Sequence, residues 1–350
     1  MTREFVHESP PGRVVFGAGA RHRLPGELER AGLRRPLVVC APGAAGLAAE
    51  LAPPGAGLHP HAAMHVPAAV AAEAVAAAAG TDGCVAVGGG SALGLAKAVA
   101  KETGLPVAAV PTTYSGSEMT PIWGITGETG KTTGRDPKVR PVLVVYDPEL
   151  TLSLPAAFSV TSGVNALAHA AEALYAPDCS PVTALVAQEA ARVTAAALPR
   201  VSADPLDLDA RADLLHGSWL AGTALGSTTM SLHHQLCHIL GGTFDLPHAP
   251  VHTAVLPHVL AVNLPAAPAA RAALESAWDT PDPAGHVFRL AHGLGAEMSL
   301  KALGLPENGI DAVVDRALAA PYANPAPVTE TVLRHLLHTA FTGESPTEDS

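Results

Sequence analysis

The first 155 residues alternate between short apolar runs and longer alanine-rich runs, and this alternation constrains the fold more than any other feature of the sequence. The short runs have the length of buried strands, and the longer ones have the length of helices. We expect strands at 13–16, 36–40, 65–66, 83–87, 106–110 and 141–146, and helices at 20–31, 68–79 and 92–103. This rhythm predicts a parallel sheet with covering helices, and such a sheet binds its ligand beyond the carboxyl ends of its strands.

The second half of the chain is helical by periodicity. Asp147-Pro148 and Leu154-Pro155 interrupt the pattern, so we expect an α/β domain over 1–155 and an all-helical domain over 156–350. Helices are predicted at 162–176 with Ser162 as N-cap, and at 181–198, 208–225, 231–240, 253–263, 268–278, 285–294, 310–319 and 329–341. Residues 343–350 are expected to fray.

Composition excludes several classes of protein. With 350 residues and 48% hydrophobic content, the chain can bury a large core. A net charge of −11 argues against a nucleic-acid-binding protein. The four cysteines (Cys40, Cys84, Cys179 and Cys237) form no CxxC pair, which is typical of reduced core residues in a cytoplasmic protein. We expect neither a signal peptide in residues 1–10 nor a membrane-spanning run.

A glycine run follows the predicted strand at 83–87. Gly88, Gly89, Gly90 and Ser91 lead into a helix expected to begin near Ala92, so backbone N–H groups would lie at the positive end of a helix dipole. A pyrophosphate fits there, because glycines allow phosphates to approach the backbone and Ser91 adds a hydroxyl donor. A tight turn would use the same residues.

A second polar loop follows the next strand. Residues 111–118 carry hydroxyls on Thr112, Thr113 and Ser115, and two polar loops at neighbouring carboxyl ends predict a nucleotide site. Lys131 and Arg135, in the glycine-rich excursion after it, could place a cation on cofactor or substrate oxygens, or could be solvated loop charges.

The usual dinucleotide fingerprint is missing. No GxGxxG follows the first strand, and Ala41-Pro42-Gly43 after the second strand offers no carboxylate to bind a ribose diol. Nothing there would repel a 2′-phosphate, so we expect NADPH to be accepted as well as NADH.

Histidines gather in the helical half. Residues 231–252 hold five of the seventeen histidines, with His234 and His238 four apart and His248 and His252 four apart. We expect Gly241 and Gly242 to end the first helix and His248 to lie on the loop that follows. Upstream, Asn165 and His169 show the same spacing. Three histidines, from two helices and a loop, could therefore bind one zinc or ferrous ion. Taken singly, each histidine could be a hydrogen-bonded structural residue.

Six segments resemble the iron-containing, group III alcohol dehydrogenase superfamily, and within it the maleylacetate reductases. They are GGGSALGLAKA (88–98), PTTYSGSEMTPIWGIT (111–126), TGRDPKVRP (133–141), YDPELTLSLP (146–155), SGVNALAHAAEALYA (162–176) and LHHQLCHILGGTFDLPHAPVHTAVLPH (232–258). The resemblance implies a nucleotide-binding α/β domain, an all-helical domain and a cleft between them where nicotinamide meets substrate.

The resemblance also implies roles for single residues. It implies that the pyrophosphate contacts Gly88, Gly89, Gly90 and Ser91. The nicotinamide half of the cofactor would contact Thr112, Thr113 and Ser115, and its ribose would contact Lys131. The superfamily's metal ligands, an aspartate and three histidines, fall on Asn165, His169, His234 and His248, and a further pocket histidine falls on His238.

Two departures from the superfamily indicate metal-free operation. Asn165 replaces the ligand aspartate, which removes a hard anionic ligand, and Gly94 replaces an aspartate in the helix after the glycine run. In both departures the chain resembles maleylacetate reductases, which are described as working without metal. The three remaining histidines could still hold zinc.

The resemblance implies an NAD(P)H-dependent reductase that adds hydride to the C=C bond of maleylacetate, or of a related 4-oxo-2-enoic acid, to give 3-oxoadipate. Histidines would hold the enolate and return the proton, and we assign His234, His238, His169 and His248 to catalysis. Arg135, His252 and Asn165 would contact substrate, although His252 could instead be structural. We expect a cytoplasmic homodimer with a small anionic substrate and no membrane or nucleic-acid partner.

Three alternatives stay open. Pro250 replaces an expected carboxylate, and residues 321–326 lack the Trp and Arg expected there, which favours a biosynthetic enone or ketone reductase. A metal-dependent alcohol dehydrogenase or a dehydroquinate-synthase-like lyase would hold stoichiometric zinc or iron. A nucleotide-binding protein without catalysis would bind NADH without turnover.

Overall fold

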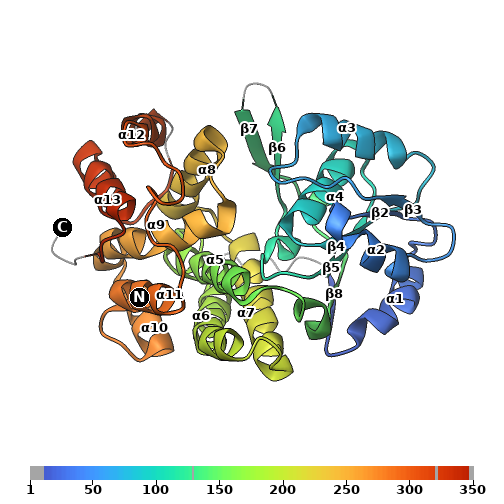
Figure 1. Cartoon of the computed structure of the whole chain (residues 1–350), viewed down its shortest axis with the longest axis horizontal. Coiled ribbons are helices and arrows are strands. Elements are labelled where there is room, and N and C mark those ends of the chain that lie inside the picture. The colour runs from blue at the N-terminus through green and yellow to red at the C-terminus, as the bar shows by residue number, and fades with distance from the viewer. Residues whose placement is uncertain (1–11, 128–129, 320–321, 347–350) are drawn as a thin grey trace. The chain divides into compact units, whose positions relative to one another are not determined.

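The computed structural model describes residues 12–127, 130–319 and 322–346 (Figure 1). The expectations for residues 1–10 and for the last part of the tail, 347–350, lie outside the described residues. The chain divides into two compact units: one ends at Leu154 and the other begins at Pro155.

The first unit is built on a parallel sheet. Within the described residues its strands are β1 (Arg13–Phe16), β2 (Leu37–Val39), β3 (Gly57–His59), β4 (Cys84–Gly88), β5 (Val107–Pro111) and β8 (Leu143–Tyr146), in the order β1-β8-β5-β4-β2-β3. Each neighbouring pair is parallel. The central strands are buried runs of Val, Ala, Leu and Cys, as expected for a sheet covered on both faces. The predicted parallel sheet is confirmed.

Helices and one hairpin complete this unit. The α-helices are α1 (Leu24–Arg30), α2 (Ala45–Leu51), α3 (Ala68–Ala77) and α4 (Gly90–Thr103), and β6 (Ile122–Gly127) pairs antiparallel with β7 (Gly130–Arg135).

Short 3-10 helices occur in both units of the described residues. They are η1 (Ala20–Arg23), η2 (Pro42–Ala44), η3 (Ser117–Met119), η4 (Pro137–Val139), η5 (Pro148–Thr151) and η6 (Leu264–Ala266). The single helix predicted over 20–31 is therefore divided into η1 and α1.

The strand predicted at 65–66 was wrong. His65 and Val66 have φ of 62° and 50°, in the left-handed region, and the sheet instead takes its outer strand from Gly57–His59. Thr126 holds this turn, since its hydroxyl donates to the His65 carbonyl oxygen at 2.8 Å and its amide to that of Val66 at 3.0 Å. A tertiary contact with β6 thus decides the conformation of two residues whose local sequence favours a strand.

The second unit is helical throughout its described residues, which confirms the predicted class. Its helices are α5 (Ala156–Tyr175), α6 (Pro181–Ala203), α7 (Leu208–Gly226), α8 (Leu232–Phe244), α9 (His248–Asn263), α10 (Pro268–Trp278), α11 (Pro283–Gly293), α12 (Gly309–Ala319) and α13 (Glu330–Thr342). Small residues let α5, α6 and α7 pack side by side (Figure 1). A Cβ at Gly163 would lie 2.6 Å from the Leu198 side chain, and one at Gly217 would lie 2.2 Å from that of Thr194.

Several predicted helix boundaries in this unit were wrong. α6 continues past its predicted end at 198, through Pro199, to Ala203. α5 begins at Ala156, so Ser162 is a buried residue inside the helix and not its N-cap. α8 continues through Gly241 and Gly242 to Phe244 and ends at Asp245, whose φ is 53°. The cost of two helical glycines, about 1 kcal/mol each, is offset by burial of Leu240 and packing of Phe244 in the core around α8, α9, α12 and α13.

A further correction concerns His248. It is the first residue of α9, which begins directly after Pro247, and not part of a loop. His248 and His252 therefore lie one turn apart on the same helix. Among the described residues, no helix is long and apolar enough to cross a membrane.

Candidate functional site

The glycine run and the hydroxyl loop lie at the ends of two neighbouring strands. Gly88 of β4 pairs with Pro111 of β5, and the Thr112 amide donates to the Gly88 carbonyl oxygen at 3.1 Å. A Cβ added at Gly89 would lie 2.9 Å from Cγ2 and 3.0 Å from Oγ1 of Thr113. Only glycine fits at position 89 while Thr113 keeps its place, so the predicted loops contact each other directly.

The start of α4 has the features of an anion site. The helix begins at Gly90, two residues earlier than predicted, and no side chain caps its first turn. Gly90 is exposed, and Gly88 has a φ of 137° that favours glycine. The uncapped amides of this fourteen-residue helix leave donors for a phosphate oxygen.

The buried carboxylate of Glu118 holds the hydroxyl loop in place. Ser115 donates to Glu118 Oε2 at 3.2 Å, and the Tyr146 hydroxyl donates to Glu118 Oε1 at 2.9 Å. Burial raises the pKa of Glu118. The Ser115 hydroxyl, which we expected at the nicotinamide half, thus also holds the loop in shape.

Sequence reasoning missed Lys97. This buried lysine of α4 donates from Nζ to the Ser117 carbonyl oxygen at 2.7 Å, to Thr120 Oγ1 at 3.0 Å and to the Ile122 carbonyl oxygen at 2.8 Å. Burial lowers its pKa to about 7. Its position in the otherwise apolar stretch from Leu95 to Ala100 was the signal for a buried, partnered cation.

Lys131 and Arg135 lie on β7 with their side chains on the same face of the hairpin, since they are four residues apart in a strand. Lys131 pairs across the hairpin with Thr126 and is partly buried, and burial lowers its pKa. Arg135 is exposed.

The predicted histidines are brought together within the helical unit. The rings of His169 and His234 are stacked with centroids 5.2 Å apart, and the His238 ring lies 6.1 Å from that of His234. The His252 ring lies 5.1 Å from that of His234 and 4.3 Å from that of His248. Helices α5, α8 and α9 thus contribute to one imidazole cluster. His169, His234 and His252 are buried, His238 is partly buried and His248 is exposed.

A carboxylate that sequence reasoning missed lies under this cluster. Glu172 is fully buried and accepts from the backbone N–H of His233 at 2.8 Å and of His234 at 3.4 Å. Its second oxygen contacts Nδ1 of His234. Glu172 therefore binds the first-turn amides of α8 and orients a histidine ring at the same time. The signal was its spacing, since Asn165, His169 and Glu172 are polar positions on one face of an alanine-rich helix.

His233 was also missed. It is fully buried, its Nε2 lies 2.9 Å from His252 Nδ1, and its ring is 5.4 Å from that of His234. Its signal in the sequence is its i, i+4 spacing to Cys237.

Burial holds most of the cluster neutral. Desolvation lowers the pKa of His169 well below its usual value, and the neighbouring His234 adds to the effect. The pKa values of His233 and His252 are lowered in the same way, first by burial and then by neighbouring imidazoles. These three rings act as hydrogen-bonding groups and not as cations at neutral pH.

The four residues to which the resemblance assigns a metal carry one fewer charge than the superfamily's ligand set. Asn165 offers a neutral amide, whose Oδ1 is buried and has no hydrogen-bond partner among the described residues. Nδ1 of His234 contacts Glu172, while its Nε2 is buried and has no hydrogen-bond partner among the described residues. The three metal-ligand atoms that gather within 4.8 Å of one another in the described part of the chain belong instead to His233, Cys237 and His252.

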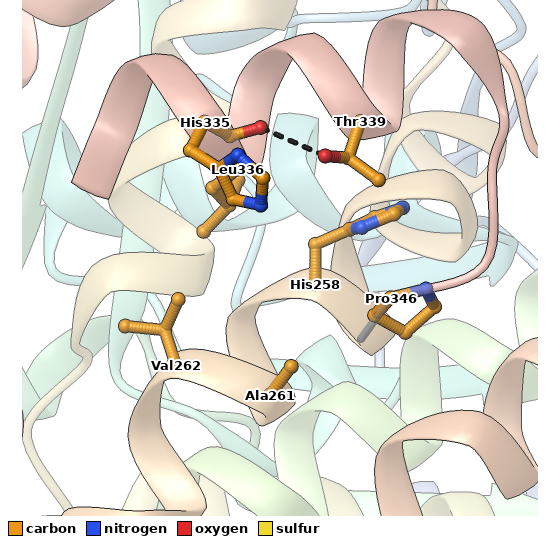
Figure 2. A pocket seen from close by; sticks show the side chains of 7 residues that line it. All are labelled: His258, Ala261, Val262, His335, Leu336, Thr339 and Pro346. Carbon is orange, nitrogen blue, oxygen red and sulfur yellow. Dashed lines mark hydrogen bonds between the residues drawn. The ribbon is translucent and has the colours of Figure 1, made fainter. Parts of the chain in front are cut away.

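A small hollow elsewhere in the helical unit is not a substrate site. Figure 2 shows it between His258, Ala261 and Val262 of α9 and His335, Leu336 and Thr339 of α13, with Pro346 beside it. Its volume of about 20 Å³ holds roughly one water molecule.

Comparison with known proteins supports the family resemblance seen in the sequence. The model of the family described as iron-containing alcohol dehydrogenase matches residues 11–148, and that of the Fe-containing alcohol dehydrogenase family, C-terminal, matches residues 159–341. Maleylacetate reductase of Sphingobium indicum is 52% identical over 349 residues, covering 98% of this chain and 99% of that protein. The corresponding protein of Pseudomonas sp. strain P51 is 47% identical over 348 residues, with the same coverage.

Solved structures show the same fold. Maleylacetate reductase from Agrobacterium tumefaciens matches with a TM-score of 0.93 at 46% identity, covering 99% of this chain and 100% of that one. A putative alcohol dehydrogenase from Ralstonia eutropha JMP134 matches with a TM-score of 0.96 at 48% identity and the same coverage. With both family models matched and full-length relatives near 50% identity, the chain belongs to the iron-containing alcohol dehydrogenase family.

Proposed function

We propose that this chain is a maleylacetate reductase: an NAD(P)H-dependent oxidoreductase that saturates the C=C bond of maleylacetate, or of a related 4-oxo-2-enoic acid, without a metal ion. The observation that carries the proposal is the Glu172–His234 pair within an imidazole cluster where burial lowers the pKa values of His169 and His252. Near-identical length and 47–52% identity to proteins named maleylacetate reductase support it.

The chemistry needs a place for negative charge and a source of one proton. A reduced nicotinamide, when bound, supplies hydride to the alkene carbon that lies β to the ketone. The electron pair of the C=C bond then moves toward the ketone oxygen, and the resulting enolate takes a proton at the α carbon to give the saturated oxo acid. No oxidant or further reductant is required.

His234 is the residue we propose as proton donor. Its Nδ1 faces the Glu172 carboxylate, while its Nε2 is buried and has no hydrogen-bond partner among the described residues. An imidazolium at this position would have the Glu172 charge in direct contact, which stabilises it. The ring orientation is fixed by the same contact, so a proton on Nε2 can be directed at the substrate.

The neutral histidines would bind the developing oxyanion. His169 lies stacked on His234, and His252 is 5.1 Å from it, so N–H donors from both rings surround the proposed donor. His238 is partly buried, and we assign it to the same role, with His248 at the exposed edge of the cluster. Preorganised donors in a dry site stabilise an enolate without a Lewis acid.

Two observations support our proposal of metal-free operation. The amide of Asn165 lacks the charge of a carboxylate ligand, and the double bond of an enone already has a carbonyl to receive the electrons. We assign Asn165, His252 and the cation of Arg135 to substrate binding. Asn165 Oδ1 is a buried acceptor with no described partner, which suits a substrate hydroxyl or a water molecule.

We infer that the nucleotide binds at the two loops of the first unit. Gly88, Gly89, Gly90 and Ser91 would contact the pyrophosphate at the start of α4, and Thr112, Thr113, Ser115 and Lys131 the nicotinamide half. No carboxylate follows β2, so we propose that NADH and NADPH are both accepted. We further propose a cytoplasmic homodimer.

The decisive test follows NADH oxidation by absorbance with maleylacetate, with and without a chelator, together with elemental analysis of the purified protein. We expect turnover that the chelator does not change, with 3-oxoadipate as product. Loss of activity on removal of stoichiometric zinc or iron would favour a metal-dependent alcohol dehydrogenase instead. Turnover of other enones but not of maleylacetate would point to a biosynthetic reductase.

A further inference from the structure

Beside the proposed catalytic histidines, three side chains with nitrogen and sulfur donors converge in the core. His233 and Cys237 lie one turn apart on α8, and His252 approaches them from α9. His233 Nε2 lies 2.9 Å from His252 Nδ1 and 3.7 Å from Cys237 Sγ. All three side chains are at most 2% exposed.

These separations are close to those in a zinc site. Tetrahedral zinc with Zn–N of about 2.0–2.1 Å and Zn–S of about 2.3 Å places two nitrogens about 3.3 Å apart and a nitrogen and a sulfur about 3.6 Å apart. The nitrogen–sulfur separation of 3.7 Å already matches. The two nitrogens, now 2.9 Å apart, need to separate by only about 0.4 Å.

The remaining ring nitrogens also suit this arrangement. His233 Nδ1 and His252 Nε2 are buried and have no hydrogen-bond partner among the described residues. When both inner nitrogens bind a metal, these outer nitrogens carry the ring protons, so neither imidazole has to lose one. Only the Cys237 thiol gives up a proton, and burial keeps its pKa well above the usual value in the metal-free protein.

Charge is balanced locally. A zinc ion bound to the Cys237 thiolate keeps one positive charge, and the buried Glu172 carboxylate lies beside it through its contact with the His233 amide at 2.8 Å. The Glu172 charge is near enough to raise the pKa of the Cys237 thiol, so the same charge would lower the cost of burying a cation there.

We propose that His233, Cys237 and His252 form a binding site for a thiophilic cation, Zn²⁺, distinct from the position formed by Asn165, His169, His234 and His248. When zinc binds, the proton between the two imidazoles moves to the outer nitrogen of the ring that carried it, and only the thiol proton is released to solvent. The three protein ligands leave one coordination position open. The proposal does not rest on the reductase activity, since its test measures binding.

The experiment titrates Zn²⁺ into the full-length protein after dialysis against a chelator, with a chromophoric chelator as competitor. We expect one equivalent of zinc to bind with release of one proton, so that affinity rises with pH. Cys237→Ser should weaken binding roughly 100-fold or more, because it removes the anionic ligand. His248→Gln is the matched control, since it removes an imidazole from the other position and should leave zinc affinity unchanged.

A spectroscopic readout identifies the sulfur ligand. Co²⁺ bound in place of Zn²⁺ should show a thiolate-to-cobalt charge-transfer band in the parent and in His248→Gln, and none in Cys237→Ser. If Cys237→Ser does not fold, as judged by circular dichroism, His252→Asn tests the site in the same way. The proposal is wrong if no zinc binds, if the cobalt band is absent, or if His248→Gln weakens binding while Cys237→Ser does not.

Discussion

Glu172 and His234 meet in the core of the helical unit, where the carboxylate of α5 contacts Nδ1 of the histidine on α8 and also accepts the two first-turn amides of that helix. One buried anion thus joins the two helices and sets the orientation of one imidazole. His169 and His233, by contrast, each lie against the ring of His252.

Replacement of Glu172 should remove the carboxylate that orients His234, the proposed proton donor. We expect Glu172→Gln to lower kcat for enone reduction roughly 100-fold or more with a small change in KM, because the amide cannot stabilise an imidazolium or fix its tautomer. The measurement is steady-state NADH oxidation with maleylacetate. Glu189→Gln, at an exposed glutamate of α6, is the control and should behave as the parent. Equal kcat in the parent and Glu172→Gln would show that the pair has no catalytic role.

Restoring the ligand aspartate tests the metal argument. We expect Asn165→Asp to bind Mn²⁺ roughly 10- to 100-fold more tightly than the parent, because a carboxylate is the hard ligand that the amide replaces. Electron paramagnetic resonance of free Mn²⁺ measures both affinities, and manganese avoids competition from the thiolate of Cys237. A parent protein that already binds Mn²⁺ as tightly as Asn165→Asp would contradict the assignment.

The close contact of Gly89 with Thr113 predicts a cofactor defect. A methyl group at position 89 would lie 2.9 Å from Thr113 Cγ2, so we expect Gly89→Ala to displace the hydroxyl loop and raise KM for NADH roughly tenfold or more. Gly46→Ala on α2 is the control, because its Cβ would meet nothing within 4 Å, and helix propensity predicts a gain in stability of about 0.5–1 kcal/mol. An unchanged KM for NADH in Gly89→Ala would remove the loop from the nucleotide site.

His258 should make the protein sensitive to acid. Burial lowers its pKa from 6.5 to about 4, so between these values the unfolded chain binds a proton that the folded chain excludes. Stability therefore falls as pH drops through this window, by roughly 1.4 kcal/mol per pH unit from this group. His169, His233 and His252 act in the same direction, since their pKa values are also lowered.

The variant His258→Gln isolates this contribution. We expect its free energy of unfolding, measured by urea denaturation from pH 7 to pH 4.5, to fall less steeply than that of the parent. At pH 8 the histidine is neutral in both states, so the difference measured there reports lost packing alone. Parallel pH profiles for the two proteins would mean that His258 titrates alike when folded and unfolded.

Local sequence determined the classes of structure. A parallel sheet was predicted from the continuous apolar runs of β2, β4, β5 and β8, because strands buried on both faces are apolar throughout. Helices were predicted after Pro155 from a 3.6-residue period, because a helix buried on one face repeats its apolar residues with that period. The same patterns placed the glycine run and the hydroxyl loop at strand ends, and the i, i+4 spacings grouped the histidines of each helix.

What only the tertiary structure decided depends on partners far apart in the chain. Val66 fills the space beside Gly94, where a Cβ would lie 2.7 Å from the Val66 side chain, so a larger residue at position 94 requires Val66 to move. Glu172, His233 and Lys97 could be assigned their contacts only once α5, α8 and the loop after β5 were in place. Sequence period reports which face of an element is buried, but the partner of a buried polar group is set by packing between elements, and that is where the chemistry of this protein lies.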